Sequence, residues 1–130
     1  MTDLSWYYAI GSATNSVEFL ADLGLPAPYQ EPYAPYGVEV DAADGLVYGH
    51  GWPVTAWRWG FLSQAQRNTL KTFCAGKSAI AYIRTRDEDW DWVYCKTHMI
   101  WQPESPPSNG SIVDFSILFR IVENYGASLP

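Results

Sequence analysis

The segment "SIVDFSILFRIV" at 111–122 constrains the fold more than any other part of the chain. Apolar side chains occupy every second position: Val113, Phe115, Ile117, Phe119 and Ile121. Because successive side chains of a strand point to opposite faces, this period of two predicts a strand with one apolar face. Such a face must be covered by another layer, so the segment predicts a core built on a β-sheet.

A second strand is predicted at 53–62, within "GWPVTAWRWGFL". Pro53 cannot donate a ladder hydrogen bond and therefore fits the start of a strand. Trp57, Trp59 and Phe61 then alternate with Arg58 and Gly60. The pattern predicts that the three aromatic rings share one face.

This strand leads directly into a helix, which we expect at about residues 63–75. Ser63 followed three residues later by Gln66 is a capping box, in which both side chains satisfy unpaired backbone donors at a helix start. Leu70, Phe73 and Cys74 follow at helical spacing, and Gly76 stands where a left-handed C-terminal cap is expected.

The rest of the chain reads as hairpins. The turn-forming pair Asp44-Gly45 predicts a hairpin over 37–51, and the acidic stretch "DEDWD" lies between predicted strands at 78–86 and 92–101. The segment "SVEFLADL" at 16–23 fits either a short strand or one helical turn. The predicted fold class is therefore mainly β, an antiparallel β-sandwich or split barrel with one flanking α-helix.

We expect two parts, an extended N-terminal arm at 1–36 and the β-sandwich domain at 37–130. The arm ends in "PAPYQEPYAPY", whose four prolines favour an extended path. Two interpretations remain open for Tyr29, Tyr33 and Tyr36: they pack back on their own domain, or they contact a neighbouring protein.

Composition favours a partner. In 130 residues, 16% are aromatic and 17% are charged, against about 25% charged residues in typical soluble domains. Large rings with few charges between them indicate either a ring-rich core or surfaces covered by another chain. Trp57 and Trp59 are candidates for both roles, core or interface anchor.

Charge and targeting signals exclude several classes. The net charge of -6 and the scattered Lys and Arg residues disfavour binding of nucleic-acid phosphates. No apolar run reaches the roughly 20 residues of a membrane span, and no signal peptide is recognisable, so we expect synthesis in the cytoplasm and no membrane partner. Cys74 and Cys95 lack CxxC spacing and are expected to be reduced and packed.

No catalytic motif is recognisable. His50 lies between glycines and His98 within a predicted strand, and neither has a sequence partner for a nucleophilic or metal site. We predict no enzyme activity and no cofactor. The acidic loop 87–91 offers carboxylates but lacks EF-hand spacing, so a solvated hairpin tip is favoured over a metal site.

A carbohydrate-binding module is the alternative function. Exposed tryptophans of a β-sandwich can stack on the apolar faces of sugar rings. Trp90 and Trp92 are the candidate stacking residues, with Asp89 and Asp91 as acceptors for sugar hydroxyls.

The chain resembles the tail tube, distal-tail and minor tail proteins of long, non-contractile-tailed bacteriophages. The resemblance lies in "GHGWPVTAWRWGFLSQAQRNTLKTF" at 49–73, "AYIRTR" at 81–86, "MIWQP" at 99–103 and "DFSILFRIVE" at 114–123. As an order of strand, helix and strands it covers residues 37–123, without the N-terminal part.

This resemblance implies a virion structural protein, made in the host bacterial cytoplasm and located in the viral tail. Family members assemble as rings, commonly hexamers, around the channel through which DNA leaves. The implied partners are further copies of the chain and other tail proteins. A negative lumen would let DNA slide past without binding, which agrees with the acidic composition.

Overall fold

The computed structural model describes residues 4–36, 38–41, 43, 45–104 and 111–129. Its elements, in chain order, are η1 (Leu4–Trp6), β1 (Ala9–Gly11), β2 (Glu18–Phe19), η2 (Leu20–Leu23), β3 (Tyr29–Ala34), β4 (Val38–Asp41), β5 (Val47–His50), β6 (Val54–Ser63), α1 (Gln64–Lys71), β7 (Ser78–Arg86), β8 (Trp92–Trp101) and β9 (Ser111–Gly126). The prediction of a mainly β fold with one flanking helix is confirmed.

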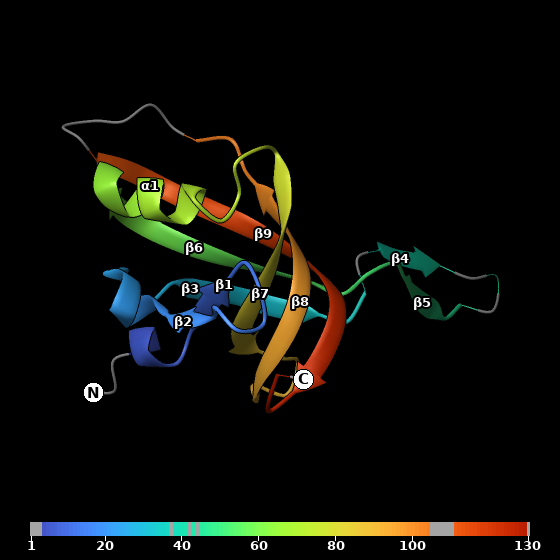
Figure 1. The fold of residues 1–130 in the computed structure, drawn as a ribbon. Helices are drawn as coiled ribbons and strands as arrows, with labels where there is room; N and C mark the ends of the chain where they lie inside the picture. The colour runs from blue at the N-terminus through green and yellow to red at the C-terminus, as the bar shows by residue number, and fades with distance from the viewer. Residues whose placement is uncertain (1–3, 37, 42, 44, 105–110, 130) are drawn as a thin grey trace.

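Seven strands form one antiparallel sheet in the order β2-β1-β7-β8-β9-β6-β3 (Figure 1). The sheet curves so strongly that its edge strand β3 reaches the end of β7. There the buried Gln30 side chain donates to the Arg86 carbonyl at 2.7 Å and accepts from the Arg86 amide at 3.1 Å. One side chain thus links two strands that are not neighbours in the sheet.

The core lies inside this curved sheet, with α1 packed beside β6 and β9 (Figure 1). Trp57 is fully buried at its centre, with edge-on ring contacts to Tyr8 and Phe119. Trp59 stacks on Phe115 at a centroid distance of 6.0 Å. The apolar face predicted for 111–122 is largely confirmed, since Phe115, Ile117, Phe119 and Ile121 are buried.

The capping box at the start of the helix is confirmed. The Gln66 amide donates to Ser63 Oγ at 3.2 Å, and the Ser63 amide donates to Gln66 Oε1 at 3.0 Å. The helix ends earlier than predicted, at Lys71, and Thr72 with an αR backbone is its C-cap. Gly76 is not among the positive-φ glycines and therefore is not a left-handed cap.

The strand pairing contradicts the prediction of a separate arm at 1–36. β1 pairs with β7 and β3 pairs with β6, and Ile10, Leu20 and Leu25 belong to the main core. Four prolines do exclude a central strand, but β3 is an edge strand, where proline is tolerated. The described part of this segment is thus integral to the sheet.

Two predicted core residues, Phe61 and Val113, point outward instead. They are cross-strand partners on β6 and β9, and their exposed fractions are 62% and 44%. The cause is a break in the pleat beside them, where Asp114 adopts a positive φ of 52°. Beyond this break Leu62 and Ile112 become the buried residues.

The predicted hairpins are confirmed. β7 and β8 pair from Ser78–Ile100 to Arg86–Trp92. β4 and β5 pair around the turn containing Gly45, whose φ is 84°. Segment 16–23 combines both expected forms, the short strand β2 followed by the 3-10 turn η2.

Candidate functional site

The β4–β5 hairpin lies outside the main sheet. It forms a two-stranded sheet of its own and projects from the body of the molecule (Figure 1). At its base the Tyr36 ring lies directly against the backbone of Gly49, so closely that no Cβ would fit there. A two-stranded hairpin is only marginally stable in water without further packing. This projection is therefore a candidate contact surface.

The five predicted interface residues differ in how far they are exposed to solvent. Trp57 and Trp59 are 0% and 3% exposed and belong to the core. Tyr33 is half-buried against that core, and burial raises the pKa of its phenol above the ordinary value. Tyr29 is 71% exposed on β3, and Tyr36 is 39% exposed at the hairpin base. Only the last two present large ring surfaces to solvent.

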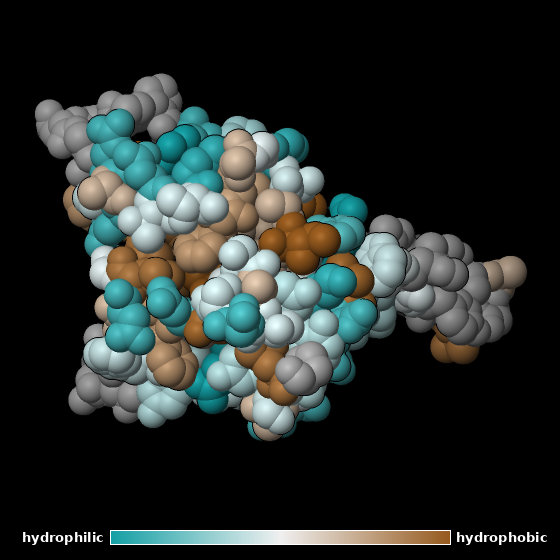
Figure 2. Space-filling model, in the orientation of Figure 1, coloured by the Kyte–Doolittle hydropathy of each residue, from teal (hydrophilic) through white to brown (hydrophobic). Residues whose placement is uncertain are grey.

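Further apolar side chains interrupt the polar surface. The Phe61–Val113 pair lies on the outer side of β6 and β9, and Ile80 is exposed on β7. Figure 2 shows hydrophobic residues between hydrophilic ones on the face where β7 and β8 lie. The exposed pair was missed by sequence reasoning because regular alternation places both residues inside.

The two candidate sugar-stacking residues have different environments. Trp90 is 54% exposed and, with Tyr8, Tyr29 and Arg86, lines a hollow of about 190 Å³. Trp92 instead packs on the core, stacked on Tyr7 at 5.4 Å and beneath the Arg86 guanidinium at 4.7 Å. Only Trp90 is therefore placed for contact with a ligand.

The acidic loop forms the tip of the β7–β8 hairpin. Carboxylate oxygens of Asp87, Asp89 and Asp91 lie within 4.8 Å of one another. Asp87 Oδ1 accepts hydrogen bonds from the amides of Asp89 and Asp91, at 2.9 and 3.0 Å. The cluster thus has a structural explanation as a turn, and it concentrates negative charge at one end of the molecule.

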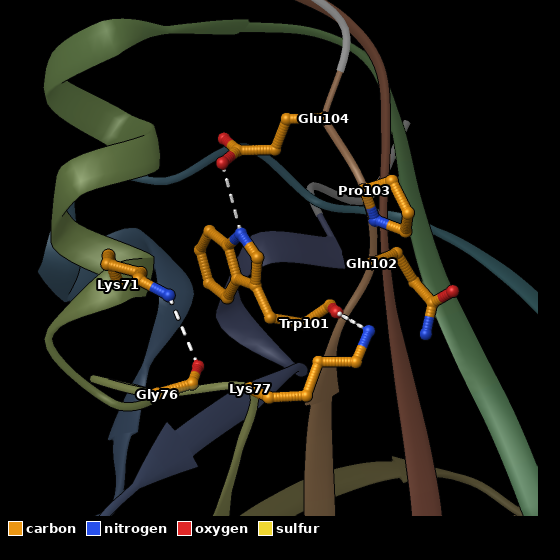
Figure 3. A pocket seen from close by; sticks show the side chains of 7 residues that line it. All are labelled: Lys71, Gly76, Lys77, Trp101, Gln102, Pro103 and Glu104. Carbon is orange, nitrogen blue, oxygen red and sulfur yellow. Dashed lines mark hydrogen bonds between the residues drawn. The ribbon is translucent and has the colours of Figure 1, made fainter.

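A cationic pocket lies at the opposite end of that hairpin (Figure 3). It has a volume of about 330 Å³ and is built where the loop after α1 meets the end of β8. The Trp101 ring is its wall, and the Trp101 amide donates to the Lys77 carbonyl at 2.9 Å. Its lining residues are Lys71, Gly76, Lys77, Trp101, Gln102, Pro103 and Glu104.

Two ammonium groups contact Trp101, one at its ring and one at its carbonyl. Lys71 Nζ lies 4.4 Å from the ring centroid of Trp101 and donates to the Gly76 carbonyl at 3.3 Å. Lys77 Nζ donates to the Trp101 carbonyl at 2.8 Å. An ammonium has three donors, so each lysine keeps donors for a ligand. The contacts of both lysines with Trp101 join residues far apart in sequence, and no local motif predicts them.

The single carboxylate lining the pocket has its own cation. Arg67 binds Glu104 through two hydrogen bonds of 2.7 and 2.9 Å, and Trp101 Nε1 donates to the same carboxylate at 3.1 Å. The hydrogen bonds from Arg67 hold the pKa of Glu104 below its ordinary value. Glu104 therefore stays ionised and pairs with Arg67, and the charge of Lys71 also helps to lower the pKa of Glu104.

The groups considered for catalysis stay apart in the described residues. His98 is exposed on β8, and the side chain of His50 lies outside the described residues. Both cysteines are free and buried, as predicted. Burial raises the pKa of Cys95 to about 12, so this thiol is protonated at neutral pH and a poor nucleophile.

Comparison with models of protein families, with curated proteins and with solved structures gave no match. Within the described part of the chain, no helix has the length and hydrophobicity that a bilayer span requires.

Proposed function

We propose that this chain is a non-enzymatic structural subunit of a bacteriophage tail, a minor tail or tail-tip component. It acts by assembling into a ring with further copies of itself and by docking to neighbouring tail proteins. The observation that carries this proposal is the β4–β5 hairpin, which projects from the body and pairs with no strand of the main sheet among the described residues. A marginal element of this kind gains stability when another subunit covers it.

The surface composition supports the same proposal. Tyr29, Phe61 and Trp52 expose 71%, 62% and 51% of their surface. Aromatic residues are enriched in protein interfaces, and Trp and Tyr are frequent among the few residues that supply most of the binding energy. The net charge of -6 agrees with a channel that DNA passes without binding, because phosphates are repelled by a negative lumen.

Electron microscopy of the purified full chain tests the proposal. We expect rings with a central opening, and we expect their loss when residues 38–50 are replaced by Gly-Ser-Gly. This replacement leaves the main sheet intact, because Val38 and His50 are cross-strand partners at the hairpin base. The variant should keep a cooperative unfolding transition. Closed particles without an opening, or rings that persist without the hairpin, would count against the proposal.

Two single substitutions test the role of the hairpin without removing it. Gly49→Ala places a methyl group where the Tyr36 ring lies and should displace the hairpin. Gly60→Ala is the matched control, since a Cβ there meets no atom within 4 Å. Rings should be weakened by the first substitution and preserved by the second.

The alternative, a carbohydrate-binding module, is favoured by one observation. Trp90 and Tyr29 line the same hollow of about 190 Å³, beside the Arg86 guanidinium, and their rings could hold a sugar between them. Binding of the full chain to a glycan array, lost in Trp90→Ala, would favour this function over assembly.

A further inference from the structure

The residues that line the cationic pocket include more positively charged side chains than carboxylates. In the part of the chain that the structure describes, the ion pairs are Arg58–Glu31 and Arg67–Glu104. Lys71 and Lys77 are in neither pair, and each donates to a backbone carbonyl. The pocket thus presents one ammonium group over the ring of Trp101 and a second at the Trp101 carbonyl, in a protein whose net charge is -6. Its chemistry suits a carboxylate-bearing occupant.

The same molecule carries a matching acidic element. The acidic tip consists of Asp87, Glu88, Asp89 and Asp91, and of these the last three are exposed. The Asp87 carboxylate fixes the turn through the amides of Asp89 and Asp91. The tip is therefore ordered before any contact and needs little reorganisation on binding.

The positions of the two elements exclude binding within one molecule. β7 and β8 pair along nine residue pairs, with Ser78–Ile100 beside the cationic pocket and Arg86–Trp92 beside the acidic tip. At about 3.3 Å per residue, the eight steps between these pairs span roughly 26 Å along the strands. Figure 1 shows the strands running side by side between these ends. The pocket of one copy can be reached only by the tip of another.

We propose that the acidic tip of one copy docks into the cationic pocket of the next, with the carboxylates of Asp89 and Asp91 on the ammonium groups of Lys71 and Lys77. This inference rests on the proposed function and names the contact by which subunits associate. The two surfaces differ, so the contact is head-to-tail. Head-to-tail contacts generate rings when the rotation closes and filaments when it does not.

The pocket size agrees with this occupant. A volume of about 330 Å³ is at the lower end for small-molecule sites, about 300 to 1,000 Å³. It can admit the short side chains of a hairpin turn. Because the ion pairs would lie at the rim, the contact should weaken as salt screens it.

Two neutralised variants test the proposal. The tip variant carries Asp89→Asn and Asp91→Asn and keeps Asp87, which organises the turn. The pocket variant carries Lys71→Gln and Lys77→Gln. Glu18→Gln with Asp22→Asn and Lys96→Gln with Arg120→Gln are the charge-matched controls, since these four residues lie outside tip and pocket. The mass of each protein is followed by light scattering over a range of concentrations.

We expect each variant to need at least tenfold higher concentration than wild type for half-maximal association, with the controls unchanged. An equimolar mixture of the two variants should associate at a lower concentration than either variant alone, because one intact tip and one intact pocket can still meet. Added salt should lower the mass of the wild-type assembly. Variants that associate like wild type, or a mixture that associates no better than either variant alone, would overturn the proposal.

These outcomes separate the inference from the proposed function. If wild type assembles and both variants assemble equally well, the tip-to-pocket contact is wrong. The proposal of ring assembly then still stands. Wild-type protein that stays monomeric at every concentration overturns both.

Discussion

Trp57→Ala is expected to lower the free energy of unfolding by about 3 to 5 kcal/mol. The indole is fully buried and has ring contacts with Tyr8, Trp59 and Phe119. Its Nε1 also donates to the hydroxyl of Thr85 at 3.1 Å, and this buried hydroxyl would lose its donor. Since whole domains are stable by only about 5 to 15 kcal/mol, this loss is a large fraction of the total stability.

Urea unfolding followed by circular dichroism measures this loss. Trp52→Ala is the matched control, because it removes the same side chain from a position that is 51% exposed, and it should change stability by less than about 1 kcal/mol. If Trp57→Ala instead gave a stable monomer that had lost only assembly, Trp57 would be an interface anchor and not a core residue.

Gln30→Leu is expected to cost about 3 kcal/mol, because it removes a buried amide that makes four hydrogen bonds. Besides its two bonds to the Arg86 backbone, Gln30 accepts from the Tyr8 hydroxyl at 3.1 Å and donates to Thr55 Oγ1 at 3.0 Å. Leucine has a similar volume, so the loss would come from the partners left unsatisfied and not from a cavity.

Hydrogen exchange gives this prediction a local readout. The Arg86 amide donates to Gln30 Oε1, so its exchange should accelerate in Gln30→Leu more than that of amides in the β8–β9 ladder. Gln64→Leu, at an exposed position on α1, is the control and should leave both exchange and stability nearly unchanged. Equal protection of the Arg86 amide in both variants would contradict the role assigned to Gln30.

The elements predicted correctly are those whose signals are local. The capping box of Ser63 and Gln66 depends on residues three apart, and the strands of the β7–β8 hairpin are adjacent in the chain. Alternation in β9 likewise identified Phe115 and Phe119 as core residues. In each case the neighbouring residues determine the local structure, so the sequence is sufficient.

The remaining features depend on contacts between distant segments. A proline-rich run marks an extended chain, but nothing in it states that β3 will become an edge strand of the sheet. The outward turn of Phe61 follows from the backbone of Asp114, about fifty residues further along. The cationic pocket likewise joins Lys71 to Trp101, which only the folded chain brings within 4.4 Å.

Self-assembly is the central claim, and the mass of the full chain in solution tests it most directly. Light scattering over a hundredfold range of concentration should show a rise from 14.6 kDa to a fixed multiple of that mass, as a closed ring requires. A mass that stays at 14.6 kDa throughout would contradict the claim, and a mass that grows without limit would contradict a closed ring.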